Sequence, residues 1–270
     1  MLGKLIKYEF KATSRSLIPL YVALLAMSII NKIFFYIDGG TGSFQFASNI
    51  FLNFFKVIVL FVFALLFFAS KVITLIIIIQ RFYKNLLKDE GYLMNTLPIK
   101  ASNNIISKLI TAVVWNIASI IVSLISILII FYDTAMFKDC ITAMGMFVNE
   151  CLARFGGTFY VIIFEIILML IVMTMASVLM IYISMLIGNL FNKHKILCSF
   201  VAFVILHFVL NIFSIIPIYS FVGVFELGMS LSFTFKIHAA FIMIIGYLVI
   251  LSIILFFGSN YILKNRLNLE

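Results

Sequence analysis

Charged side chains are scarce in this chain of 270 residues. Asp, Glu, Lys and Arg together make up 11% of the sequence, whereas a typical soluble domain has about 25%. Hydrophobic residues make up 65%, and the mean hydropathy is +1.26. One aqueous core cannot bury so much apolar surface, so the composition excludes an ordinary soluble domain. It predicts an all-α, polytopic integral membrane protein.

Cysteine is rare as well, with three in the whole chain and no Cys-x-x-Cys pair. An odd number without that spacing indicates neither a metal centre nor a disulfide framework. Cys140 and Cys151 both fall in the loop expected between the third and fourth spans, and their pairing in an oxidising compartment stays open at this stage. Residues 1–16 have no short apolar core followed by a small-residue cleavage site, so a removable signal peptide is not expected.

Motifs for nucleotide hydrolysis and nucleic-acid binding are missing from the sequence. No Gly-x-x-x-x-Gly-Lys-Ser/Thr stretch occurs, and the glycine-rich residues 38–48 lack its ending, so the chain is not expected to be an enzyme or to bind a cofactor itself. The formal charge of +9 is not gathered into a basic cluster interleaved with aromatics, which argues against nucleic acid. His207 alone cannot form a two-histidine protease site, and we expect it to hydrogen-bond between helices.

Most of the sequence consists of long apolar runs. They predict a single transmembrane domain over residues 1–270 with six spanning helices, at residues 16–36, 51–80, 105–131, 157–188, 196–216 and 237–263. Pro19 would fall in the first turn of the first span, where its missing N–H costs little. Ser184 and Gly188, four residues apart, favour a close helix crossing.

Two segments beside the spans have patterns of their own. Residues 1–13 place apolar side chains at helical spacing opposite three lysines, which indicates an amphipathic helix in the membrane surface; the alternative is the positive flank of the first span. Residues 218–236 are apolar but are interrupted by two glycines and a glutamate. They are too short to cross, so a re-entrant hairpin before the sixth span is expected.

The cations are distributed unevenly between the two sides that six spans define. Thirteen of the nineteen Lys and Arg residues lie near the termini, in residues 81–108 and in the turn at 193–195, whereas four lie on the opposite side. Lys56 and Lys71 fall within the second span. Because positively charged loops remain in the cytoplasm, both termini and residues 81–108 are expected there.

Residues 81–108 form the longest polar interruption of the chain. Within them, residues 89–99 combine an acidic pair and a glycine with four apolar side chains, Tyr92, Leu93, Met94 and Leu97. Pro98 ends any helix that begins there. The pattern predicts a short helix at the membrane surface, in residues 81–104, where a soluble partner can bind; an ordinary loop helix that packs on its own spans is the alternative.

The sequence DEGYLMNTLPIKASNNIISKL at Asp89–Leu109 is similar to a pattern in small bacterial ABC-2-type permeases, E-G-Y-L-x-x-T-L-P-[IV] followed by a polar gap and S-K-L. The layout of the whole chain resembles the same family. There the segment is a coupling helix that docks on an ATPase subunit. By this resemblance the coupling contact would be made by Asp89, Glu90, Gly91, Tyr92, Leu93, Met94, Leu97 and Pro98.

The resemblance implies a function, partners and a location. The chain would be the permease subunit of an ABC exporter in the bacterial plasma (inner) membrane, with a second permease copy or a similar permease beside it. Two copies of a soluble ABC ATPase would bind ATP and Mg. Because the chain is mostly apolar and has few buried charges, we expect an amphipathic cargo rather than a small ion. A peptide or toxin is the first expectation, and a drug or lipid is the second. A carrier, channel or scaffold that does not use ATP stays open as the alternative.

Two charged residues lie well inside the predicted spans. Glu165 is about eight residues from the outer end of the fourth span and Lys71 about nine from the cytoplasmic end of the second, so they lie at different depths and are not expected to pair. We expect Lys71 to extend toward the inner headgroups. Glu165 has no evident partner in the sequence, and an intramembrane charge is costly, so we expect it on the substrate path.

Overall fold

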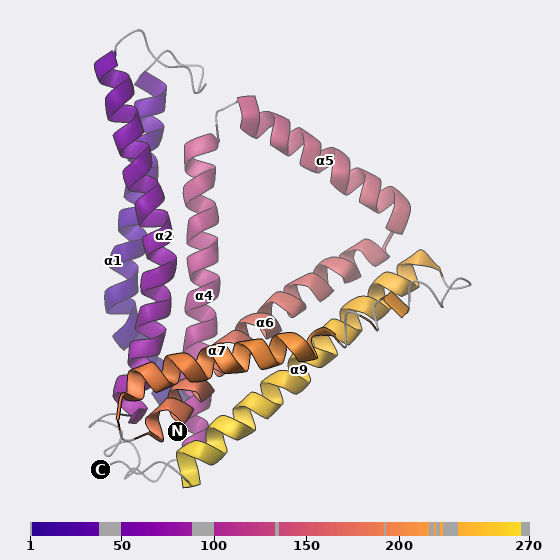
Figure 1. Cartoon of the computed structure of the whole chain (residues 1–270). Helices are drawn as coiled ribbons and strands as arrows, with labels where there is room; N and C mark the ends of the chain where they lie inside the picture. Colours follow the sequence, from indigo (N-terminus) through magenta and orange to yellow (C-terminus); the bar gives the residue numbers. More distant parts are fainter. Residues whose placement is uncertain are drawn as a thin grey trace. The chain divides into compact units, whose positions relative to one another are not determined.

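The computed structural model of the protein describes residues 2–37, 50–87, 100–132, 135–191, 193–215, 219, 222–223 and 232–265. Within these residues the chain forms seven α-helices and no strand (Figure 1). The helices are α1 (Leu2–Ile37), α2 (Ile50–Leu87), α4 (Ala101–Phe131), α5 (Ala135–Phe155), α6 (Thr158–Asn189), α7 (Lys195–Phe213) and α9 (Phe233–Asn265). The expected all-α class is confirmed.

Six of the helices, α1, α2, α4, α6, α7 and α9, are long and apolar enough to cross a membrane. Each overlaps one of the six predicted spans, so that number is confirmed for the described part of the chain. Helices satisfy their own backbone hydrogen bonds, which the bilayer core requires. Helix α2 has 38 residues. At about 1.5 Å per residue it is longer than a hydrocarbon core of about 30 Å, so its ends reach the headgroups or beyond.

The N-terminal helix differs from the prediction. A separate surface helix over residues 1–13 was expected, but α1 continues unbroken from Leu2 to Ile37 with Pro19 inside it. Packing explains the continuity. The indole N–H of Trp115 on α4 donates a hydrogen bond to Thr13 Oγ1 at 2.7 Å, and the ring of Phe10 lies 6.1 Å from the Trp115 ring. These contacts hold the third and fourth turns of α1 against α4, in line with the span.

The connection between the third and fourth spans also differs. The sequence predicts a loop over residues 132–156, whereas the structure has the 21-residue helix α5 there. The helix settles the cysteine pairing within one chain. Cys140 and Cys151 are separated along α5 by about 16 Å, and a disulfide requires Cα atoms within about 7 Å. Both thiols are free in the structure.

The chain forms two compact units. Unit 1 comprises Met1–Ile6, Ile78–Val113 and Phe155–Glu270, and unit 2 comprises Lys7–Ile77 and Val114–Arg154. Helices α1, α2 and α4 therefore contribute residues to both units, and the last residue of α5, Phe155, belongs to unit 1. The predicted re-entrant hairpin over residues 218–236 lies largely outside the described residues and stays a prediction.

Unit 2 is built around α1, α2 and α4, which run alongside one another (Figure 1). One buried side chain from each helix forms a core cluster of Leu24, Phe63 and Ile130. Polar contacts add to it. The Tyr21 hydroxyl of α1 lies 3.0 Å from Thr74 Oγ1 of α2. Inside a membrane such hydrogen bonds stabilise helix pairs by roughly 0.6–1.7 kcal/mol each.

In unit 1, α6 packs against both α7 and α9. The crossing with α7 is close at Gly188, where an added Cβ would collide with the backbone of Ser199. The close crossing expected from Ser184 and Gly188 is therefore confirmed. On α9, a Cβ at Gly258 would lie 2.9 Å from Ile183 Cδ1 of α6, so a second glycine also allows close approach.

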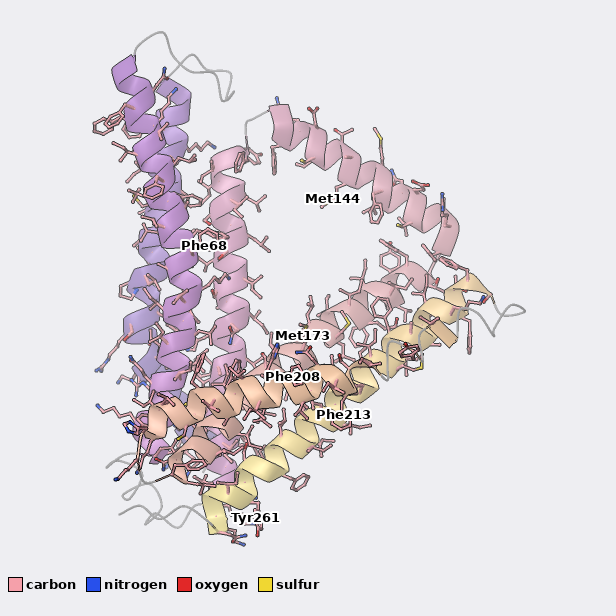
Figure 2. All side chains as sticks on the ribbon, viewed as in Figure 1. Phe68, Met144, Met173, Phe208, Phe213 and Tyr261 are labelled. Atoms are coloured by element: carbon pink, nitrogen blue, oxygen red, sulfur yellow. The ribbon has the colours of Figure 1, made fainter. Side chains whose placement is uncertain are left out.

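Large apolar side chains on the spans point outward rather than into a core (Figure 2). More than half of the surface is exposed at each of Phe68, Met173, Phe208, Phe213 and Tyr261. Helix α7 has no buried residue along its length. A soluble protein rarely exposes so much contiguous apolar surface. Lipid tails cover it readily, as expected for a multi-pass membrane protein.

Candidate functional site

Glu165 and His238 lie beside each other in unit 1. Glu165 is in the second turn after the start of α6 and His238 in the second turn of α9, about 10 Å and about 8 Å from the helix starts. These helices are the fourth and sixth spans, which cross a membrane in the same direction. Similar distances from their starts therefore place the two side chains at similar depth.

The geometry is that of a shared hydrogen bond. Nδ1 of His238 is 2.9 Å from one Glu165 carboxylate oxygen and 3.0 Å from the other. The Glu165 side chain is 11% exposed and that of His238 is 20% exposed. Burying a carboxylate is costly unless it is hydrogen-bonded, and a ring N–H supplies the bond. If the proton resides on the carboxyl group, its O–H donates to Nδ1 instead.

The sequence did not reveal this partner for Glu165. The sixth span is predicted to begin at residue 237, so the sequence places His238 at the membrane surface rather than at the depth of Glu165. The structure begins α9 at Phe233, which places His238 one turn inside the helix. A usable signal was present, since spans four and six start on the same side and each has a titratable residue near its start.

Lys71 is held differently from the expectation. Its ammonium group donates a hydrogen bond to Ser119 Oγ of α4 at 2.9 Å, within unit 2, rather than extending freely toward the headgroups. Ser119 is buried. Ser119 of α4 therefore accepts a hydrogen bond from a cation inside the second span. Charged side chains within membrane spans are usually paired with a polar group in this way.

His207 does not form the hydrogen bond expected between helices in the described residues. Its ring stacks on Phe203 of the same helix, with centroids 6.1 Å apart and planes 10° apart. The backbone carbonyl of His207 accepts a hydrogen bond from the Asn211 side chain, also within α7. His207 is exposed on a helix surface that lipid covers, so it is not part of the Glu165–His238 pair.

A second cluster lies at the other end of unit 1, where α2 ends and α4 begins. The rings of Phe82 on α2 and Tyr182 on α6 stack with centroids 3.9 Å apart and planes 14° apart. Both side chains are almost fully buried, at 0% and 1% exposure. Leu86 on α2 and Ile105 on α4 are fully buried as well. The helix ends on both sides of residues 88–99 are therefore firmly anchored in unit 1.

The first turns of α4 also bury a polar face. Asn104, Ser107, Lys108 and Thr111 recur three or four residues apart, and each is no more than 4% exposed. Ser107 and Thr111 donate hydrogen bonds to backbone carbonyls one turn earlier. The Asn104 side-chain oxygen is buried and has no hydrogen-bond partner within the described part of the chain. This face differs from the apolar packing of the spans and lies directly after residues 88–99.

The eight residues assigned to coupling by resemblance lie outside the described residues. These are Asp89, Glu90, Gly91, Tyr92, Leu93, Met94, Leu97 and Pro98, and their role stays a prediction. Among the residues that are described, no group of three or more His, Cys, Asp and Glu side chains is arranged to hold a metal ion.

In the described residues, the fold and these sites define an all-helical, multi-pass membrane protein with a hydrogen-bonded Glu165–His238 pair inside one helix bundle. No family model, no curated protein and no solved structure matches this chain.

Proposed function

We propose that the chain is the transmembrane permease subunit of an ATP-binding-cassette exporter in the bacterial plasma membrane, with both termini in the cytoplasm. It would move an amphipathic substrate, a peptide or toxin in the first place, out of the cell. Two copies of a separate ATPase would supply the energy, and a second permease would complete the path. The proposal rests on residues 89–109, whose sequence resembles a coupling helix, together with the anchored helix ends beside them.

The anchoring supports a mechanical role for the segment. A force on residues 88–99 acts on the ends of α2 and α4, and the Phe82–Tyr182 stack passes it to α6. The same helix carries Glu165, about 25 Å from Tyr182 at 1.5 Å per residue. An α-helix is stiff over that length, so a shift at its cytoplasmic end moves the Glu165–His238 pair as well. ATP-driven closure of the partner subunits would drive such a shift.

The test begins with co-purification of the full-length chain and a P-loop ATPase expressed with it. Replacing Leu93 and Met94 together with aspartate should weaken the association and abolish transport-linked ATP turnover. Burying one such apolar side chain contributes about 1.5–3 kcal/mol to the free energy of association, and an aspartate in its place removes this contribution and adds a buried charge. Met173→Ala is the matched control, because Met173 is an exposed side chain on α6 and its loss should leave association intact.

Wild-type yield and wild-type ATP turnover in the Leu93/Met94 double variant would contradict the coupling role. The exporter proposal would then depend on the layout of the spans alone.

A carrier driven by a proton gradient is the second candidate, favoured by the Glu165–His238 pair. Ionisable groups within spans often mark proton pathways. Purified protein in liposomes, without any ATPase, distinguishes the two. Substrate movement driven by an imposed pH gradient and lost in Glu165→Gln would establish a carrier, whereas movement only with ATPase and ATP would establish the exporter.

A further inference from the structure

Helix α5 has two clearly different sides. Six large apolar side chains recur every three or four residues and therefore share one face, which we call the apolar stripe: Phe137, Ile141, Met144, Val148, Leu152 and Phe155. Met146 and Phe147, which are 66% and 64% exposed, lie outside the stripe. The charged residues lie away from this stripe. An α-helix with such a division is stable only where an apolar environment and water meet along its length.

The centre of the stripe is exposed within the described part of unit 2. Ile141 is 55% exposed and Met144 is 68% exposed, with Met144 standing out from α5 in Figure 2. Among the described residues, the ends of the stripe make the aromatic contacts. Phe137 lies 5.7 Å from the ring of Tyr132, at the end of the third span. Phe155 stacks on Phe233, the first residue of α9, with centroids 6.2 Å apart.

The connections of α5 fix where it lies. Three residues, 132–134, join it to α4, and two residues, 156–157, join it to α6. Because α4 and α6 are consecutive spans, both ends of α5 lie at the same membrane surface, opposite to residues 88–99. A helix of 21 residues, about 30 Å long, that has both ends at one surface runs along that surface.

The charges on α5 balance. Lys138 and Arg154 are positive, and Asp139 and Glu150 are negative. Arg154 pairs with Glu150 one turn earlier, at 2.6 Å, on the exposed side. A helix with no net charge gains nothing from anionic headgroups, so any binding to lipid depends on the apolar stripe.

We propose that α5 is an interfacial helix that binds the lipid bilayer on the side opposite to residues 88–99. The apolar stripe inserts at the boundary between headgroups and acyl chains, and the charged side faces water. Insertion does not depend on the charge of the lipid headgroups. The inference is independent of the exporter proposal, because it uses only the six spans and the side chains of α5.

The experiment uses the full-length protein in liposomes, with the three native cysteines replaced by serine. A nitroxide is attached at a single cysteine placed at position 141 or 144 of the stripe, or at position 142 or 149 of the polar side. Collision with oxygen, which concentrates in lipid, is compared with collision with a water-soluble nickel chelate. We expect oxygen to dominate severalfold at Ile141 and Met144, and nickel to dominate at Thr142 and Asn149. The pattern should be the same in phosphatidylcholine alone and with added phosphatidylglycerol.

Three outcomes would overturn the proposal. Nickel collisions throughout would show α5 free in water. Low collision rates with both reagents at the stripe would show a protein partner or a second copy on it. A steady change in depth from position 141 through 142 and 144 to position 149, without helical periodicity, would show a seventh span.

A pair of variants tests the cause. Met144→Glu with Val148→Glu should expose a label at position 141 to nickel, whereas Thr142→Glu should leave that label in lipid.

Discussion

Breaking the Glu165–His238 pair from either side should destabilise the protein, and removing both partners should restore most of the loss. The two variants are Glu165→Leu and His238→Phe, which exchange each polar side chain for an apolar one of similar size. In the first, Nδ1 of His238 loses the acceptor that lies 2.9 Å away. In the second, the carboxylate loses its donor while it remains 11% exposed. Each single variant therefore leaves one polar group buried without a partner.

The size of the effect follows from burial. Removing one partner of a fully buried ion pair costs about 3–5 kcal/mol, but hydrogen bonds between membrane helices average about 0.6 kcal/mol. The Glu165–His238 pair is partly exposed and lies near the helix starts, so we expect the free-energy cost of removing one partner to fall between these two limits. We expect Glu165→Leu to lower the free energy of unfolding by about 1 kcal/mol and His238→Phe by about 1–3 kcal/mol, since a carboxylate without a donor costs more. The double variant should lie within about 1 kcal/mol of wild type.

The assay is unfolding of purified protein in mixed micelles by increasing fractions of sodium dodecyl sulfate, followed by circular dichroism. The coupling free energy comes from the double-mutant cycle. His207→Phe serves as the control, because His207 is exposed and stacks only within α7; it should change stability by less than about 0.5 kcal/mol. Additive losses, with the double variant as unstable as the sum of the singles, would refute the reasoning.

Two further predictions concern packing in unit 1. Phe82→Ala removes a fully buried ring that stacks in the core, and it should lower stability by about 3–5 kcal/mol. The Phe68 side chain on the same helix is exposed, so Phe68→Ala should leave stability nearly unchanged. The same unfolding assay compares the two variants. Gly188→Ala forces a methyl group into the backbone of α7 and should lower stability by about 1–3 kcal/mol, whereas the control Gly246→Ala has open space and should leave stability unchanged. The midpoints of thermal aggregation of the two variants in detergent are compared. Equal midpoints would contradict the close crossing.

The class of the protein and its spans were predictable from the sequence because the signal is long and uniform. Each span is an apolar run that a bilayer selects directly, and six such helices are present. The boundaries were less predictable. The sequence predicts a separate helix over residues 1–13 from apolar side chains at helical spacing opposite lysines, but the contacts of Phe10 and Thr13 with Trp115 depend on residues about one hundred positions apart. Local pattern carries no information about such contacts.

The sequence predicts one of the two residues of the candidate site. Glu165 was singled out because an intramembrane carboxylate is costly, yet its partner was missed, because a pair between helices depends on where each helix begins. A shift of four residues in the start of α9 moved His238 from the surface into the span. Residues 132–156 are predicted as a loop, although apolar residues within them repeat at helical spacing, which was a usable signal for α5.

The central claim is that residues 88–99 lie in the cytoplasm between the second and third spans, where an ATPase can reach them. Single cysteines at Lys4, Lys88, Lys264 and Lys138, in a background with the native cysteines replaced by serine, test it in intact cells with a membrane-impermeant maleimide. The uneven distribution of Lys and Arg predicts labelling at position 138 alone, and labelling at all four positions after permeabilisation. Labelling at position 88 in intact cells would contradict the orientation and, with it, the proposed coupling to an ATPase.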